Sequence, residues 1–265
     1  MRISGSTALV TGATGGLGEA ICRALADRGA RIVMSGRRAD VLEPLSRELG
    51  AHPVICDLAE RDDLQSLLAE AGEVDILVAN AGVPADGAID EYTPEQIDRA
   101  LQVNLCAPIL AAHALMPGMV ERGSGHMVFM SSLSGKVATS GSALYSATKF
   151  GLRGFASALR QDLWDTGVGV SAVFPGPIRE AGMFAQAGVE MPAIAGTRSP
   201  DQVGRAVVRA IERNRGEIDV ASPPLRWASA LAGVAPSAIA SLNRRLGATR
   251  IAEQLARSEA HRSAR

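Results

Sequence analysis

The chain has 265 residues and a formal net charge of -1, a length that suits one α/β domain or two small ones. Hydrophobic residues make up 47% and charged residues 21%, as in a globular protein. Because aromatic residues make up only 3% and the charge is close to neutral, the composition argues against a nucleic-acid-binding surface.

The cysteine content and the first residues bear on the compartment. Cys22, Cys56 and Cys106 are too few and too scattered for a disulfide framework or a zinc site, so no metal is expected. Residues 1–5 lead directly into a strand-like run without an apolar signal region, and no stretch of 18 uncharged apolar residues follows. We therefore expect a cytoplasmic protein with no membrane span.

Short apolar runs alternate with longer amphipathic segments of helical period along most of the chain. The runs occupy residues 7–10, 31–34, 53–56, 76–79, 126–130 and 168–174, with a weaker run at 218–220. Strands that are buried on both faces and separated by helices predict an α/β fold with a doubly wound parallel sheet, the Rossmann fold, over residues 1–221. Ligands are expected at the carboxyl ends of such strands.

A glycine-rich turn, TGATGGLG at residues 11–18, follows the first strand. Its glycines permit a tight turn and close backbone approach, and the helix that begins near Leu17 offers amide donors and a positive dipole end to a pyrophosphate. In this strand–turn–helix context we expect a dinucleotide to be bound by Gly12, Thr14, Gly16, Leu17 and Gly18.

Arg37 and Arg38 follow the second strand, where NAD-binding proteins usually carry an acid for the ribose 2'-hydroxyl. No carboxylate is present there, and two guanidinium groups suit a 2'-phosphate. The sequence therefore predicts a preference for NADP(H), with NAD(H) as the second choice. The alternative interpretation is that both arginines are the solvated start of the next helix.

Residues 93–120 are rich in alanine and leucine and predict one long helix. Pro94 suits its first turn, and Pro108 is expected to bend it.

Tyr145 and Lys149 are four residues apart in a chain that contains only two tyrosines and two lysines. On a helix this spacing places an ammonium group beside a phenol. A nearby positive charge favours the phenolate form, which makes the tyrosine a candidate acid and base. The alternative is a surface tyrosine with a solvated lysine.

In this order and spacing, the motifs resemble those of a classical short-chain dehydrogenase/reductase over about residues 5–221. The shared marks are the Thr-Gly-x-x-x-Gly-x-Gly turn, Asp57-Leu58, Asn80-Ala81-Gly82, Asn104, Ser131-Ser132, Tyr145-x-x-x-Lys149 and Pro175-Gly176. Because both Gly15 and Gly16 are present, the turn also fits the extended type of the family. The short length and the lack of a substrate domain favour the classical type.

The resemblance implies a catalytic set of Asn104, Ser132, Tyr145 and Lys149. In the family, the equivalent serine hydrogen-bonds the reacting oxygen, and the tyrosine exchanges a proton with the carbonyl or alcohol. The lysine holds the nicotinamide ribose and lowers the tyrosine pKa, and the asparagine supports a water chain that reaches the lysine. By the same resemblance Ser131 is structural.

The resemblance also implies the remainder of the cofactor site. Asp57 and Leu58 would flank the adenine, Asn80, Ala81 and Gly82 would lie beneath the cofactor, and Pro175, Gly176 and Ile178 would lie beside the nicotinamide. One position departs from the family pattern. A threonine that contacts the carboxamide often follows two residues after the position of Ile178, but this chain has Glu180. A contact from residue 180 is therefore an open question.

Two segments bear on the substrate and on partners. Residues 179–199 form a long, methionine-containing segment with few charges, which predicts a lid over a hydrophobic substrate; alternatively, its apolar residues pack only on protein. Residues 222–265 form a predicted helical C-terminal extension with seven arginines and two glutamates. This extension could cap the cleft, contact another subunit or, less favoured, lie on a membrane surface.

The expected activity is that of an NADP(H)-dependent oxidoreductase that interconverts a hydrophobic ketone or aldehyde and an alcohol. The alternative is an NADPH-binding regulatory or sensor protein with little turnover, which the intact Ser132, Tyr145 and Lys149 argue against. An epimerase is a third reading, disfavoured because no substrate domain is present. By resemblance, the helix of residues 93–120 and the helix that begins near Tyr145 would form the subunit interface of a homodimer or homotetramer.

Overall fold

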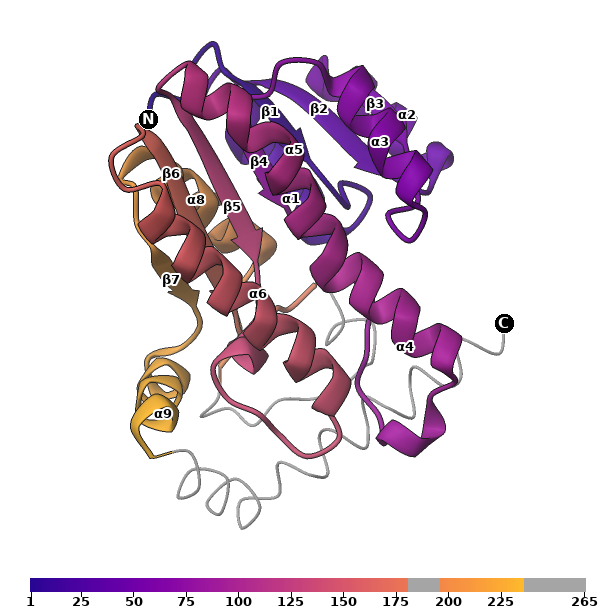
Figure 1. The fold of residues 1–265 in the computed structure, drawn as a ribbon, viewed down its shortest axis with the longest axis vertical. Coiled ribbons are helices and arrows are strands. Elements are labelled where there is room, and N and C mark those ends of the chain that lie inside the picture. The colour runs from indigo at the N-terminus through magenta and orange to yellow at the C-terminus, as the bar shows by residue number, and fades with distance from the viewer. Residues whose placement is uncertain (181–195, 236–265) are drawn as a thin grey trace.

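Seven parallel strands form one sheet in the order β3-β2-β1-β4-β5-β6-β7 (Figure 1). The computed structural model describes residues 1–180 and 196–235. The strands are β1 (Thr7–Val10), β2 (Arg31–Gly36), β3 (His52–Ile55), β4 (Ile76–Ala79), β5 (Gly125–Met130), β6 (Val168–Pro175) and β7 (Glu217–Val220). Every predicted strand is present within two residues at either end, so the predicted doubly wound sheet is confirmed.

Helices cover both faces of the sheet. On one face lie α1 (Gly16–Ala26), α2 (Ala39–Leu49) and α8 (Pro200–Glu212), whose buried residues share one hydrophobic core. On the other face lie α3 (Arg61–Ala71), α5 (Ala107–Glu121) and α6 (Ala143–Asp162), which share the second core. The helix α9 (Pro223–Val234) follows β7 (Figure 1).

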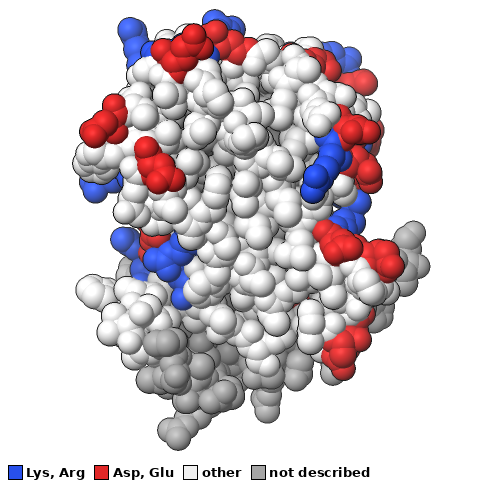
Figure 2. All heavy atoms as spheres, in the orientation of Figure 1, with Lys and Arg blue, Asp and Glu red and all other residues white. Residues whose placement is uncertain are grey.

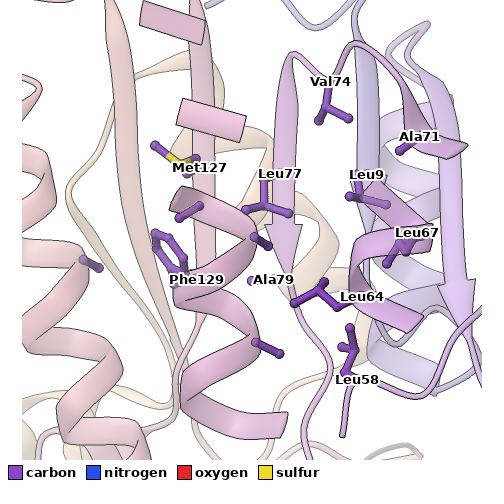
Figure 3. Close-up of a cluster of buried hydrophobic side chains, with 14 of the residues drawn as sticks. Leu9, Leu58, Leu64, Leu67, Ala71, Val74, Leu77, Ala79, Met127 and Phe129 are labelled. Carbon is purple, nitrogen blue, oxygen red and sulfur yellow. The ribbon is translucent and has the colours of Figure 1, made fainter. Parts of the chain in front are cut away.

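Successive strand residues point into opposite cores, as the pleat of a strand requires. Leu9 of β1, Leu77 of β4 and Met127 of β5 are register partners and belong to the core drawn in Figure 3. The residues that follow them belong to the other core: Val10, Val78 and Val128. Because both faces are buried, these strands are apolar throughout and do not alternate.

The predicted helix of residues 93–120 is present but interrupted. It consists of α4 (Pro94–Leu101), a π-helical turn at Gln102–Cys106 and α5. The amide of Ala107 donates to the carbonyl of Gln102, five residues back. Pro108 has no N–H to donate to the carbonyl of Asn104, which explains why regular α-helical bonding fails here.

The segment Pro94–Glu121 is long and apolar enough to cross a membrane by length and composition alone. In this fold it lies over the sheet, where α5 contacts α3, β4 and β5. Only 39% of its most apolar window is buried within the chain, so one side of this helix faces outward.

Two predicted segments are described only in part. Of the predicted lid at residues 179–199, residues 181–195 lie outside the described part of the chain. Of the predicted extension at residues 222–265, α9 is described and residues 236–265 lie outside. The lid, the boundary at residue 222 and the roles of the extension therefore stay predictions.

Candidate active site

A cleft of about 450 Å³ lies at the carboxyl ends of the strands. Its lining includes every predicted cofactor residue: Gly12, Thr14, Gly16, Leu17, Gly18, Arg37, Arg38, Asp57, Leu58, Asn80, Ala81, Gly82, Tyr145, Lys149, Pro175, Gly176 and Ile178. Ser132 also lines it. Residues that the sequence analysis did not assign complete the wall, including Val83, Pro84, Arg99 and Val103.

The glycine-rich turn leaves no room for a side chain at Gly12 or at Gly18. Gly12 has a φ of +68°, and a Cβ atom on Gly18 would lie 2.2 Å from the Gly12 carbonyl oxygen. Helix α1 therefore begins directly against the turn. Gly15 is its N-cap, and within the described residues no side chain caps the helix. The amides of its first turn thus remain available to an anionic ligand, which fits a pyrophosphate.

The end of β2 is joined to this turn. A Cβ atom on Gly36 would lie 2.7 Å from Cγ2 of Thr14, so only glycine permits this approach. The guanidinium of Arg38 donates to the carbonyl oxygen of Thr14. Arg38 therefore supports the turn, and the side chain of Arg37 is 59% exposed.

The carboxylate of Asp57 lies between two cations. Nη2 of Arg99, on α4, donates to Oδ2 at 2.8 Å and to Oδ1 at 3.2 Å, and Oδ1 also accepts from the amide of Ala59. Nη1 of Arg37 is 4.0 Å from Oδ2. Burial alone would raise the pKa of Asp57, but the hydrogen bonds from Arg99 and Ala59 outweigh it and hold the pKa below its ordinary value.

Tyr145 and Lys149 share one face of α6, as their spacing predicts. Tyr145 is only 7% exposed, and its amide donates to the carbonyl of Ala85 at 3.2 Å. Nζ of Lys149 lies 5.5 Å from the centre of the Tyr145 ring. The solvated surface pair considered as the alternative is therefore wrong for these two residues.

Lys149 is fixed to the end of β5 at two points. Its Nζ donates to the carbonyl of Met130 at 3.0 Å, and its own carbonyl accepts from Oγ of Ser131. The hydroxyl of Ser131 thus helps to fix α6 to the end of β5, which is consistent with the structural role predicted for it. Burial lowers the pKa of Lys149 from 10.5 to about 8, which leaves most of it as ammonium near pH 7.

Ser132 is the N-cap of a short 3-10 helix, η3 (Leu133–Gly135). Its Oγ accepts from the amide of Ser134 at 3.1 Å. Among the described residues its hydroxyl proton has no acceptor, so this proton is available to a bound oxygen atom.

Asn104 does not line the cleft but lies directly behind it. Its side-chain amide is bonded twice to Val83: Oδ1 accepts from the amide at 2.7 Å and Nδ2 donates to the carbonyl at 2.9 Å. A Cβ atom on Gly82 would lie 3.3 Å from Oδ1 of Asn104 and 3.7 Å from Nζ of Lys149. Asn104, in the π-helical turn, therefore holds Gly82 and Val83, which follow β4, close to Lys149.

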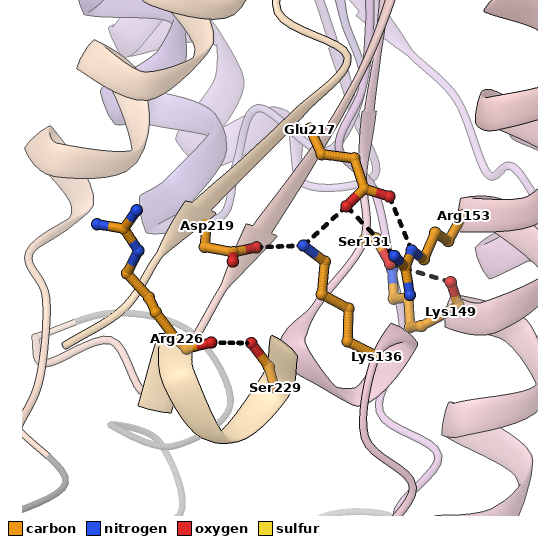
Figure 4. Close-up of polar contacts among 8 residues, drawn as sticks. All are labelled: Ser131, Lys136, Lys149, Arg153, Glu217, Asp219, Arg226 and Ser229. Atoms are coloured by element: carbon orange, nitrogen blue, oxygen red, sulfur yellow. Dashed lines mark hydrogen bonds and ion pairs between the residues drawn. The ribbon is translucent and has the colours of Figure 1, made fainter. Parts of the chain in front are cut away.

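A cluster of charged side chains joins the end of η3 and α6 to β7 (Figure 4). Lys136, which directly follows η3, pairs with Asp219 at 2.6 Å and with Glu217 at 2.8 Å. Arg153, one turn beyond Lys149 on α6, pairs with the same Glu217 at 2.8 Å. The segment that carries Ser132 and the helix that carries Tyr145 and Lys149 are thus tied to one strand.

Glu180, which replaces the family threonine, is not among the described residues that line the cleft. Its φ is +71°, and its carboxylate accepts from Nε of Arg179.

Residues 6–191 match the model of the short chain dehydrogenase family. The chain belongs to the short-chain dehydrogenase/reductase family. It is accordingly an NAD(P)-dependent dehydrogenase or reductase that acts on a small molecule.

Relatives of this short-chain dehydrogenase/reductase include ketoacyl reductases. The ketoacyl reductase HetN of Nostoc sp. is 35% identical over 232 residues, which cover 84% of this chain and 81% of HetN. A 3-ketoacyl-(acyl-carrier-protein) reductase from Brucella melitensis complexed with NADH has a TM-score of 0.74 at 26% identity, covering 82% of this chain and 97% of that one. A short-chain dehydrogenase from Sphingobium yanoikuyae in complex with NADPH has a TM-score of 0.76 at 27% identity, covering 88% and 95%. A nicotinamide dinucleotide is thus supported, whereas its 2'-phosphate is not decided by these relatives.

Proposed function

We propose that this enzyme is an NADP(H)-dependent carbonyl reductase that interconverts a hydrophobic ketone or aldehyde and the corresponding alcohol, with Tyr145 as the proton donor and acceptor. One observation carries the proposal: Ser132, Tyr145 and Lys149 line the same cleft as a glycine-rich turn and three arginines.

Bound NADPH would supply the hydride, so the protein must position the carbonyl and deliver one proton. Tyr145 donates its hydroxyl proton to the carbonyl oxygen in reduction and takes a proton from the alcohol in the reverse direction. Ser132 donates its hydroxyl proton, which has no acceptor among the described residues, as a hydrogen bond to the same oxygen. The ammonium of Lys149, 5.5 Å from the ring centre, stabilises the negative charge that develops on the tyrosine oxygen.

The preference for NADP(H) is supported by charge at the adenosine end of the cleft. Arg37, Arg38 and Arg99 line it together with one carboxylate, that of Asp57, which leaves a net charge of +2. A 2'-phosphate is close to a dianion at neutral pH, so this end of the cleft complements it better than it complements a neutral hydroxyl.

Replacing Arg37 with aspartate should reverse the cofactor preference. Since a charge-assisted hydrogen bond contributes about 1.5–3 kcal/mol, we expect the NADPH/NADH ratio of kcat/KM to fall by about tenfold to a hundredfold or more. Steady-state kinetics with each cofactor measures this ratio. An unchanged ratio would show that Arg37 does not contact the 2'-phosphate.

The proposed substrate class rests on the described part of the cleft and on the relatives. The described lining includes the apolar residues Val83, Pro84, Met130 and Ile178 as well as Ser132, Tyr145 and Lys149. The ketoacyl reductases among the relatives favour a 3-oxoacyl group as one member of the hydrophobic ketone class.

A substrate panel tests this assignment. Cyclic ketones, long-chain 3-oxoacyl thioesters, aldehydes and small polar sugars are each incubated with enzyme and NADPH, and oxidation of the cofactor is followed by absorbance. We expect the apolar carbonyl compounds to be reduced with the higher kcat/KM. Faster turnover of the polar sugars would contradict the proposed substrate class, and binding of NADPH without turnover of any compound would favour the sensor alternative.

The outward side of α4, α5 and α6 is proposed as the interface of a homodimer or homotetramer. A broad band without charged residues runs over α5 and α6 (Figure 2), and Val120 and Phe150 are exposed apolar side chains on these two helices. We expect analytical ultracentrifugation to give at least twice the chain mass and a Phe150→Glu variant to dissociate. A wild-type protein that sediments as a monomer would contradict this interface.

A further inference from the structure

Arg99 was not predicted from the sequence, yet it is the cation closest to Asp57. It extends from α4, whereas Asp57 follows β3 and Arg37 follows β2, so three separate segments meet at the adenosine end of the cleft. In the proposed function, Arg99 contributes only to the net charge of this end of the cleft.

The hydrogen bonds of Asp57 show how Arg99 limits the pairing of Arg37 with this carboxylate. Oδ1 of Asp57 is held by the amide of Ala59 at 3.0 Å and by Nη2 of Arg99 at 3.2 Å. Oδ2 has two cations within reach, Arg99 at 2.8 Å and Arg37 at 4.0 Å. Arg37 already forms a long ion pair with Oδ2. If Arg99 were absent, Arg37 would be the remaining cation near Oδ2 among the described residues, and a modest rotation of this exposed side chain would shorten that ion pair.

We propose that Arg99 is a positioning residue for cofactor discrimination: by neutralising Asp57, it leaves the guanidinium of Arg37 free for the 2'-phosphate of NADP(H). The proposal rests on the proposed function, because it presupposes that Arg37 faces this phosphate. Arg99 acts on the phosphate only through the carboxylate that would otherwise compete for Arg37.

The charges of Asp57, Arg37 and Arg99 support these separate roles for the two arginines. An anionic carboxylate 4.0 Å from the proposed phosphate-binding arginine would both attract that arginine and repel the phosphate. Arg99 offsets both effects, because its guanidinium contacts both oxygens of Asp57. Neither effect acts on the ribose hydroxyl of NADH, so removal of Arg99 should weaken NADPH binding selectively.

A double-mutant cycle separates this role from direct phosphate contact. Dissociation constants for NADPH and NADH are measured by the fluorescence of the reduced nicotinamide for the wild type, Arg99→Met, Asp57→Asn and the double variant. The readout is the ratio of the two constants, so any effect of Asp57 on the adenine, which both cofactors share, cancels.

We expect Arg99→Met to lower the preference for NADPH by about tenfold or more in the wild-type background, the effect of losing one charge-assisted hydrogen bond. In the Asp57→Asn background the same substitution should change the preference by less than about threefold, because no carboxylate remains to capture Arg37. An equal loss in both backgrounds would show that Arg99 contacts the phosphate itself and would overturn the proposal. No loss in the wild-type background would overturn it as well.

Controls separate this proposal from the proposed function. A wild-type enzyme that binds NADH more tightly than NADPH would refute the cofactor assignment itself, whereas the cycle refutes only the role of Arg99. Arg28→Met removes an arginine whose partner is Glu212, far from the cleft in the fold, and should leave the ratio unchanged. If Arg99→Met does not fold, Arg99→Gln takes its place in the cycle, because it removes the charge and keeps an N–H donor.

Discussion

Replacing Tyr145 with phenylalanine is expected to lower kcat by about 10²- to 10⁴-fold, the contribution of a positioned general acid and base. The substitution removes one oxygen atom and its proton and keeps the ring in the cluster with Ala85, Ala100 and Leu144. The dissociation constant for NADPH should therefore stay within about threefold of the wild-type value. Stopped-flow reduction of a substrate from the panel and fluorescence titration of NADPH measure the two quantities separately.

Tyr92→Phe is the matched control. Tyr92 is the other tyrosine of the chain and packs against the same cluster as Tyr145. We expect this variant to retain kcat within about twofold, since it supplies no proton to the reaction. A parallel loss of NADPH binding and turnover in Tyr145→Phe would instead show that the tyrosine is structural.

Replacing Lys149 with methionine should abolish turnover and at the same time stabilise the unliganded protein near pH 7. Turnover should fall by about 10²-fold or more, because the developing charge on Tyr145 loses its neighbouring cation. Burial lowers the pKa of Lys149 from 10.5 to about 8, so below pH 8 the native state contains a buried ammonium that the unfolded chain solvates freely.

The pH dependence of that stabilisation follows from linkage. Between pH 8 and pH 10.5 the unfolded lysine still holds its proton while the native lysine has lost it, so the penalty in the wild type declines as the pH rises. The pKa shift of Lys149 corresponds to about 3 kcal/mol in the free energy of unfolding. The variant also loses the hydrogen bond from Lys149 to Met130, which offsets about 1 kcal/mol of that gain. Urea unfolding near pH 7 and near pH 10 should therefore show a stability advantage for Lys149→Met that shrinks at the higher pH.

Lys136→Met provides the comparison, since Lys136 is the other lysine of the chain. This lysine pairs with Asp219 and Glu217, so its removal leaves two carboxylates without this partner and should destabilise the protein. If Lys149→Met were less stable than the wild type near pH 7, the ammonium of Lys149 would carry no desolvation penalty.

The fold followed from the sequence because burial on both faces makes each strand an uninterrupted apolar run. Val78 in β4 shows why. It lies in one core and its neighbours Leu77 and Ala79 lie in the other, and both cores require apolar side chains. The predicted site residues other than Asn104 also meet in one cleft, because the glycine turn and the motifs follow the strands whose carboxyl ends form it.

Arg99 could not be found in the same way. Arg99 lies four positions before Val103 on one face of a helix, and both residues line the cleft, but the helical spacing alone does not show which face of the helix lies toward the cleft. Pro108 was a sign that the helix would bend, but a proline predicts an irregularity and not its hydrogen-bonding pattern. The partner of Arg99, Asp57, is 42 residues away and carries no local signal.

The charged cluster of Lys136, Arg153, Glu217 and Asp219 has a consequence for biosynthesis. The four residues predicted to be catalytic are all translated by residue 149, but the carboxylates that hold their supporting segments emerge about 70 residues later. A nascent chain in which β7 has not yet left the ribosome therefore contains all four residues predicted to be catalytic but lacks the strand that holds η3 and α6 together. A chain that terminates before Glu217 would lack this clamp for the same reason.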